Sequence, residues 1–273
     1  MRLALLCDIH GNLPAFEAAL EHAARQRVDQ LVIAGDIVVG SPDSAACWQR
    51  ARSLGCPILR GNHERYLFHF RDPEAPALWR TAQFAPVQWA LAQFAPDQLQ
   101  EMGQLPLTLR LPEAPGLLLV HASARNDHDS IHPYTAEEQL APMFAGEEAA
   151  LIVRGHNHLP FVRQWAGGLI ATSGSVGLPL DGNPTAQYLI LEQRPSGWHI
   201  AHQSVPYNLE ATLRRFDVTG YLEATGPMGR LFFREVISAT HLIVPFLRAY
   251  HRWNQESLLT LDQAVDRFLA DGR

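Results

Sequence analysis

The chain has 273 residues, of which 47% are hydrophobic and 18% are charged, so it can bury a large globular core and is not an intrinsically disordered protein. Its net charge of −6 and the lack of a basic run exclude the electrostatic footprint of a protein that binds nucleic acid polymers. The apolar run near Met1 is too short for a secretion signal, no run reaches the length of a membrane span, and three cysteines without metal-type spacing fit a reducing compartment, so we expect a cytoplasmic protein with no membrane partner.

Three short apolar runs near the N-terminus predict buried strands, because each ends at a glycine or a polar residue. They alternate with two helical segments, which gives a β-α-β-α-β order. Right-handed crossovers would place the ends of these strands at one edge of a sheet. In chain order we expect a strand at 3–7, a helix at 14–25, a strand at 31–34, a helix at 41–53 and a strand at 57–60.

The middle of the chain interrupts this rhythm. Residues 66–104 are rich in Trp, Phe, Ala, Gln and Pro and predict two or three short helices, which could form a wall or lid beside a site. Strand patterns return after this insertion and alternate with turn signals. We expect a hairpin at 107–111 and 117–120, a helix at 135–144, a buried strand at 150–153, and antiparallel strands at 161–165, 169–172, 186–192 and 198–204.

The last part of the chain, from 206 onward, predicts helices at 207–215, 228–254 and 261–269, the second interrupted at Pro245. Its apolar side chains are too many to leave in water, so we expect segment 226–273 to pack on the core, against a second copy of the chain, or over the edge of the active site. These side chains are Phe232, Phe233, Leu242, Ile243, Phe246, Leu247 and Trp253.

Chemistry-bearing side chains follow the predicted strands. They include carboxylates, an amide and imidazoles but no thiolate, a set that suits Mn, Fe, Zn, Ni or Co, with Mn favoured. The set is large enough for two ions bridged by one carboxylate, and such a pair can clamp a phosphoryl group and lower the pKa of a bridging water. The residues are Asp8, His10, Asp36, Asn62, His63, His121, His156 and His158.

Each short motif also has an ordinary structural explanation. A polar pair such as Asp8 and His10 can simply finish a strand, and an Asn after Gly61 is common in turns. A single histidine such as His121 is more often a core residue than a ligand. The motif Gly155-His156-Asn157-His158 is more specific, and the joint occurrence of all of them in this order favours the metal site.

With these motifs in hand, residues 1–205 resemble the calcineurin-like metallophosphoesterase superfamily. The resemblance implies a four-layer α/β/β/α sandwich, here with a helical insertion at 66–105 and a helical C-terminal extension at 206–273. It also implies a dinuclear metal centre in which Asp36 bridges the ions and His63 lies outside the metal shell, near the leaving group. One ion would be held by Asp8, His10 and His158, and the other by Asn62, His121 and His156.

A finer resemblance is to the YfcE-like phosphodiesterase branch, on residues 35–43 and 174–179. Val38-Val39 stands where protein serine/threonine phosphatases carry an Asp-Arg pair. Three departures from the branch are Cys7 before the first aspartate, Thr172-Ser173 before Gly174, and Leu180 where a basic residue is frequent. None removes a ligand, but Leu180 weakens the expected binding of substrate phosphate.

The sequence therefore predicts a metal-dependent hydrolase that cleaves phosphoester bonds through a metal-bridging hydroxide. Small phosphodiesters or nucleotides are the expected substrates, and Asp36, Asn62 and His63 are the expected catalytic residues. A phosphomonoesterase is the alternative reaction. A non-catalytic metal-binding regulatory protein is the alternative of another class, and a homo-oligomer formed through the C-terminal helices is possible.

Several neighbouring residues have two interpretations. Cys7 should point away from Asp8 into the core, because side chains alternate along a strand. Glu64 could orient a histidine or serve as a helix N-terminal carboxylate. Arg60 and Arg65 could reach phosphate or lie in solvent, and the polar loop at 127–132 could contact substrate.

Overall fold

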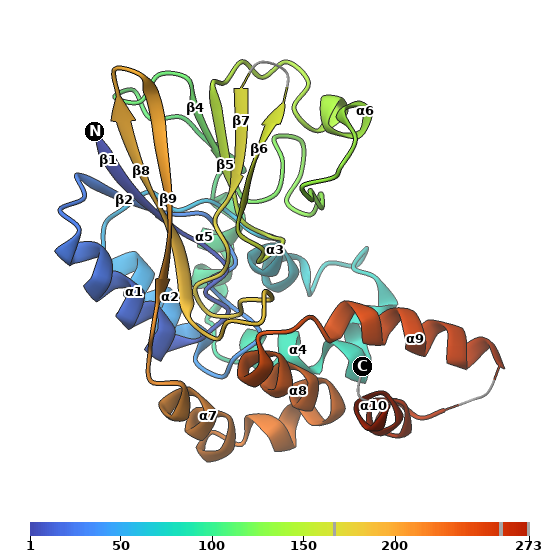
Figure 1. The fold of residues 1–273 in the computed structure, drawn as a ribbon. Helices are drawn as coiled ribbons and strands as arrows, with labels where there is room; N and C mark the ends of the chain where they lie inside the picture. Colours follow the sequence, from blue (N-terminus) through green and yellow to red (C-terminus); the bar gives the residue numbers. More distant parts are fainter. Residues whose placement is uncertain (166–167, 257–258, 272–273) are drawn as a thin grey trace.

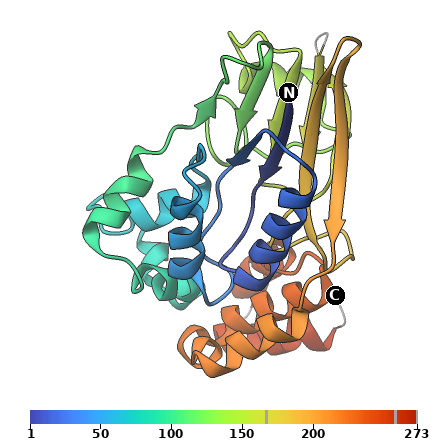
Figure 2. The same ribbon diagram turned by 90° about the vertical axis from the view of Figure 1, so that its left-hand side faces the viewer.

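The computed structural model describes residues 1–165, 168–256 and 259–271. Two β-sheets stack face to face, and helices cover the outer face of each (Figure 1). This is the predicted four-layer α/β/β/α arrangement, and the prediction of the fold class is confirmed. The C-terminal helices gather at one end of the sheets, beside the helical insertion (Figure 2).

The first sheet has four strands in the order β2-β1-β8-β9. β1 pairs parallel with β2 and antiparallel with β8, so the N-terminal strand is central. Side chains of β1 alternate between the layers: Leu3 and Leu5 face the second sheet, whereas Ala4 and Leu6 face the helices. The strands are Gln30–Ile33 (β2), Arg2–Leu6 (β1), Ala186–Arg194 (β8) and Gly197–Val205 (β9).

The second sheet has five strands in the order β3-β4-β5-β7-β6. β4, β5 and β7 are mutually parallel, and β3 and β6 form antiparallel edges. The predicted hairpin at 107–120 is confirmed by the β3–β4 pairing. The strands are Thr108–Leu109 (β3), Leu117–Val120 (β4), Leu151–Arg154 (β5), Phe161–Trp165 (β6) and Gly168–Thr172 (β7).

The prediction of a strand at 57–60 was wrong, because only one isolated β-bridge forms there. Ile58 lies beside Ile33, and two backbone hydrogen bonds flank that pair. The amide of Arg60 then bonds to the carbonyl of Pro106 instead of continuing the ladder. The chain turns into a helix immediately afterwards, so the segment delivers its polar residues to the sheet edge without becoming a strand.

Two helices, α1 and α2, cover the first sheet, and the insertion adds short helices as expected. The helix expected at 135–144 is instead a four-residue α-helix followed by a 3₁₀ turn that contains Pro142, which has no backbone N–H to donate. The bounds are Leu13–Arg25 (α1), Ser44–Ser53 (α2), Asn62–His69 (α3), Ala77–Arg80 (η1), Ala82–Phe84 (η2), Ala85–Leu91 (α4), Pro96–Gln104 (α5), Glu137–Leu140 (α6) and Ala141–Met143 (η3).

Four helices form the end of the chain: Leu209–Val218 (α7), Tyr221–Ser238 (α8), Ile243–Glu256 (α9) and Leu261–Ala270 (α10). The break within the long apolar segment falls between α8 and α9, not at Pro245. Ala239 has a left-handed backbone with φ of 50° and ends α8, whereas Pro245 lies in the first turn of α9, where its missing N–H costs nothing.

These helices pack on the rest of the chain. Trp89 of α4 contacts Tyr221 of α8, and the Tyr221 hydroxyl donates to the carbonyl of Gly40 over 2.8 Å. Farther out, Phe246 and Phe268 join α9 and α10 to α8 in a small apolar core. Within the described ranges, the chain contains no helix of the length and apolarity needed to cross a bilayer.

Candidate metal centre

The candidate site lies where strands of both sheets end. β1 leads to Asp8 and His10, β2 leads to Asp36, β4 leads to His121, and β5 leads to a pair of histidines. Asn62 is the first residue of α3, which follows the segment that bridges to β2 at Ile58. Parallel strands of two stacked sheets thus bring residues from far apart in the sequence to one edge. The histidines after β5 are His156 and His158.

The backbone at this edge is strained. Non-glycine residues rarely adopt positive φ, and each instance costs on the order of 1–3 kcal/mol. Among the residues that follow β1, β2 and β5, five of the predicted ligands have φ between 50° and 70°. Such clustering of left-handed residues is typical of functional sites, where side-chain placement outweighs backbone preference. These residues are Asp8, His10, Asp36, His156 and His158.

Two glycines allow the carboxylates to approach other backbone closely. A Cβ atom on Gly61 would lie 2.1 Å from Oδ1 of Asp36, and one on Gly155 would lie 2.7 Å from Oδ2 of Asp8. Neither distance is sterically possible. The glycines that precede Asn62 and His156 in the sequence are therefore part of how the two carboxylates are positioned.

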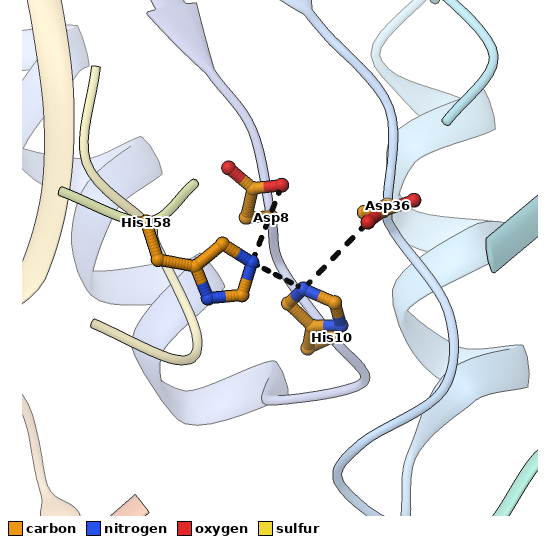
Figure 3. A group of neighbouring side chains, drawn as sticks. All are labelled: Asp8, His10, Asp36 and His158. Atoms are coloured by element: carbon orange, nitrogen blue, oxygen red, sulfur yellow. Dashed lines mark hydrogen bonds and ion pairs between the residues drawn. The ribbon is translucent and has the colours of Figure 1, made fainter. Parts of the chain in front are cut away.

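One group of donors contains Asp8, His10, Asp36 and His158, whose ligand atoms lie within 4.8 Å of one another (Figure 3). The Nε2 atoms of His10 and His158 are 3.0 Å apart. His158 Nε2 is 3.6 Å from Asp8 Oδ1, and His10 Nε2 is 3.9 Å from Asp36 Oδ2. All four residues are buried.

A second group shares Asp36 and adds His121 and His156. His121 Nε2 lies 3.3 Å from Asp36 Oδ2 and 3.2 Å from a side-chain amide atom of Asn62. Nδ1 of His156 lies 2.9 Å from the same Asn62 atom. The structure therefore brings together all seven residues predicted as metal ligands, in two groups that meet at Asp36.

The hydrogen bonds of the imidazoles indicate that these groups fit cations. Nδ1 of His10 faces the carbonyl of Val39 at 2.9 Å, and Nδ1 of His158 faces the carbonyl of Leu178 at 2.7 Å. A carbonyl accepts a proton, so each Nδ1 carries the hydrogen and each Nε2 keeps its lone pair. The two Nε2 atoms are 3.0 Å apart, so their lone pairs face each other. Donors bound to one ion at about 2.0–2.2 Å lie roughly 3 Å apart, so a metal ion between them would relieve the repulsion.

The pKa shifts within the cluster also indicate that it fits a cation. Burial lowers the pKa of His10 to about 3, helped by neighbouring His63, and raises the pKa of Asp8 to about 7. Burial also opposes ionisation of Asp36, yet His121 and His63 hold the pKa of that carboxyl well below its usual range. The pKa of His121 rises to about 9 because Asp36 outweighs burial. A nearby positive charge therefore stabilises the ionised carboxylates. A proton on His121 supplies this charge here, and a metal ion could supply it instead.

Cys7 is buried in the apolar core as expected, but it does not point away from Asp8. Its Sγ lies 3.1 Å from Asp8 Oδ2 and 2.6 Å from Oγ of Ser173. The strand ends at Leu6, and the left-handed backbone at Asp8 breaks the alternation of side chains. Burial raises the pKa of the Cys7 thiol well above its ordinary value, so it is a neutral group that braces the carboxylate.

Glu64 braces the backbone rather than a histidine. Its carboxylate accepts hydrogen bonds from the amides of Asp36, Ile37 and Gly61 over 2.8–2.9 Å. Gly61 is the N-cap of α3, the helix that contains Glu64. The interpretation of Glu64 as a helix N-terminal carboxylate is therefore closer to the structure than its interpretation as a group that orients a histidine. The residue ties the end of β2 to the start of α3 and so fixes the relative position of Asp36 and Asn62.

His63 lies in the first turn of α3. Its amide donates to Asp36 Oδ1 over 2.8 Å, whereas its side-chain Nε2 remains 3.8 Å from Asp36 Oδ2. Its Nδ1 is buried and has no hydrogen-bond partner. Burial lowers the pKa of this imidazole. The backbone of His63 thus holds the loop, and its side chain is left for another purpose.

Arg60 and Arg65 are neither in solvent nor aimed at the metal groups. Nε of Arg65 donates to both carboxylate oxygens of Asp127, at 2.9 and 2.8 Å, and Nε of Arg60 is 4.0 Å from the same carboxylate. Asp127 is buried. Asp127, a loop residue beside the site, therefore pairs with Arg65 and lies near Arg60.

A cavity of about 440 Å³ opens over the two groups. Its floor includes His10, Asn62, His63, His156 and His158. One wall comes from the insertion and another from α8 and α9, so the expectation that segment 226–273 covers the site edge is confirmed for part of that segment. Sequence reasoning missed most wall residues, because an apolar side chain that lines a pocket is not distinguishable from a core residue. They include Tyr66, Phe84, Val87, Met228 and Glu235.

Comparisons with known proteins show the family of the chain. Residues 1–195 match the family model of the calcineurin-like phosphoesterase superfamily domain. An uncharacterized protein of Methanocaldococcus jannaschii is 26% identical over 213 residues, which are 70% of this chain and 83% of that protein. A symmetrical bis(5′-nucleosyl)-tetraphosphatase of an Acidovorax species is 33% identical over 172 residues, which are 60% of this chain and 57% of that protein.

Two solved structures share the fold. A metallophosphoesterase of Sphaerobacter thermophilus has a TM-score of 0.70 at 24% identity, covering 88% of this chain and 100% of that one. A hypothetical protein of Pyrococcus horikoshii has the same TM-score at 17% identity, covering 85% of this chain and 97% of that one. The likeness therefore extends beyond the two sheets.

Proposed function

The chain belongs to the calcineurin-like phosphoesterase superfamily and is a metallophosphoesterase, and we propose that it hydrolyses small phosphodiesters at a centre of two divalent metal ions. The observation that carries the proposal is the pair of donor groups that meet at Asp36. In this proposal Asp8, His10 and His158 hold one ion. Asn62, His121 and His156 hold the other, and Asp36 bridges them.

The reaction adds water across a P–O bond. Two bound ions would polarise the phosphoryl oxygens and lower the pKa of a water, which supplies the nucleophile near neutral pH. The oxygen of that water bonds to phosphorus, the bond from phosphorus to the leaving oxygen breaks, and the leaving oxygen takes up a proton. The products are a phosphomonoester and an alcohol.

We propose that His63 interacts with the leaving oxygen and donates a proton to it. Its side chain lines the cavity and is not among the predicted metal ligands, so its imidazole can hydrogen-bond a phosphoryl or leaving oxygen. The contact of its ring with Tyr66, at 5.4 Å between centroids, and its backbone bond to Asp36 fix its position. The amide of Asn62 can stabilise charge that develops on the phosphoryl group.

A diester suits the site better than a monoester. A monoester carries a second negative charge and needs additional cations, whereas Leu180 supplies an apolar side chain to the cavity. Phosphomonoesterase activity remains the alternative reaction. The tetraphosphatase relative from Acidovorax suggests a dinucleoside polyphosphate as an alternative substrate.

A chromogenic assay tests the proposal. Protein stripped of metal with a chelator should not hydrolyse bis(p-nitrophenyl) phosphate, and Mn²⁺ should restore turnover. Turnover that is indifferent to chelation contradicts a metal-dependent reaction. Full metal loading without turnover on any phosphoester favours the non-catalytic metal-binding protein instead.

A further inference from the structure

The cavity over the metal groups combines apolar walls with a shortage of cations. We propose, as a refinement of the function proposed above, that the substrate is a phosphodiester of a single phosphoryl group whose second ester group is apolar, an aryl or alkyl group. This group occupies the space between the insertion and the C-terminal helices. The same walls disfavour dinucleoside polyphosphates.

The walls come from three separate parts of the chain. Phe84 and Val87 belong to the insertion, Leu178 and Leu180 follow β7, and Phe232 and Leu247 belong to α8 and α9. Elements that far apart in the sequence converge on one space of about 440 Å³, a volume in the range of small-molecule pockets. The predicted metal ligands and His63 would orient the phosphoryl group, and the other polar side chains of the lining include Gln83, Ser130, His132, Asn157, Glu235 and His241.

Apolar surface is left uncovered at this cavity. Val244 is 38% exposed and Leu78 is 47% exposed, and both line it. Most of the large hydrophobic side chains of the described chain are more deeply covered than these two. An apolar group of the substrate would cover them and would be released from water on binding.

Positive charge is scarce in the same place. The sequence contains arginine but no lysine, and no arginine is among the described residues that line the cavity. Three guanidinium groups of the surrounding elements are engaged by other residues: Arg65 by Asp127, Arg154 by Asn157 and two carbonyls, and Arg163 by Glu137. Glu235, in the wall, adds an acidic group.

The charge count decides between substrate classes. Two divalent ions can balance the charge on the reacting phosphoryl group, but the remaining phosphates of a tetraphosphate chain would need further cations. The walls offer none, so those phosphates would lose water without gaining partners. A diester with one negative charge and an apolar group meets no such penalty.

Diesters with a common leaving group test the inference. We compare methyl p-nitrophenyl phosphate, phenyl p-nitrophenyl phosphate and diadenosine tetraphosphate with the Mn²⁺-loaded protein. Burial of one methylene is worth about fourfold in affinity, so partial burial of the phenyl ring predicts kcat/KM about tenfold or more above that of the methyl ester. The phenyl ester should also exceed the tetraphosphate.

A pair of variants locates the effect. Val244→Arg places a cation in the wall at an exposed position, and it should reduce the phenyl-to-methyl ratio several-fold and raise the relative rate on the tetraphosphate. Val218→Arg is the matched control, because Val218 is an exposed valine of α7, 61% exposed, that does not line the cavity. It should leave the ratio unchanged.

The outcomes separate the two levels of the proposal. Equal kcat/KM on the methyl and phenyl esters, or a preference for the tetraphosphate, overturns the inference and leaves the diesterase intact. The same ratio in both valine variants also overturns it, because the ring then lies elsewhere. Failure to hydrolyse any of the three compounds, with metal bound, refutes the proposed function itself.

Discussion

Glu235 connects the cavity wall to the stability of the fold. This carboxyl is buried near the end of α8, and its Oε1 accepts the backbone N–H groups of Leu242 and Ile243 over 2.6 and 2.8 Å. It thereby satisfies two amides at the start of α9. Replacement by Gln keeps an oxygen acceptor of the same shape but removes the ionisation.

The size of the stability that Glu235 contributes follows from its pKa. Burial raises the pKa of Glu235 from 4.5 to about 7, although the two amides oppose the rise. Between those pH values the folded state holds the proton more tightly than the unfolded state, so the stability contributed by Glu235 is complete below pH 4.5 and is lost as pH rises through 7. A difference of this size corresponds to at most about 3 kcal/mol, or roughly 6–12 °C in Tm.

The assay compares thermal unfolding of wild type and Glu235→Gln at pH 5 and pH 8. The Tm of the variant should gain on that of wild type as pH rises, by up to the amount above. The control is Glu223→Gln, an exposed glutamate on the same helix, whose difference from wild type should be small at both pH values. A difference between Glu235→Gln and wild type that is independent of pH would refute the reasoning.

Three further predictions concern the site. His63→Gln should retain bound metal and Tm but lower kcat by about 10²–10⁴-fold, with a smaller loss for leaving groups of low pKa such as p-nitrophenolate; loss of metal with no leaving-group dependence would mean a purely structural role. Wild type should show higher kcat/KM for bis(p-nitrophenyl) phosphate than for p-nitrophenyl phosphate, and the reverse order contradicts the charge argument. Gly61→Ala should abolish activity because its methyl group collides with Asp36, whereas Gly55→Ala, which strains the backbone at a φ of 61° but meets open space, should lose stability and retain activity.

Much of the candidate site could be predicted from the sequence. Asp8, Asp36, His121 and His156 each come directly after, or within a few residues of, an apolar run that forms a buried strand. Parallel pairing then brings such strand ends to one edge, so the position of the polar residues along the chain determines their proximity in space. The two-sheet sandwich was implied by the resemblance of residues 1–205 to the superfamily, not by the pattern of runs and turns alone.

Other features depended on tertiary contacts that local pattern does not encode. The segment at 57–60 has the composition of a strand, yet the amide of Arg60 bonds to Pro106 from a distant loop and the ladder stops. The break before α9 is set by Glu235 and Ala239 rather than by the proline that punctuates the sequence. The thiol of Cys7 turns toward Asp8 because the backbone there is left-handed, which a run of apolar residues does not reveal.

The most direct test of the central claim is metal content measured together with activity on the wild type and Asp36→Asn. Asp36 belongs to both donor groups, so we predict two ions per chain in the wild type, bound through nitrogen and oxygen only, with activity that rises with the second equivalent. Asp36→Asn should weaken both ions and abolish hydrolysis of bis(p-nitrophenyl) phosphate. Saturation at one ion per chain, or an Asp36→Asn variant that keeps two ions and full activity, would contradict the account.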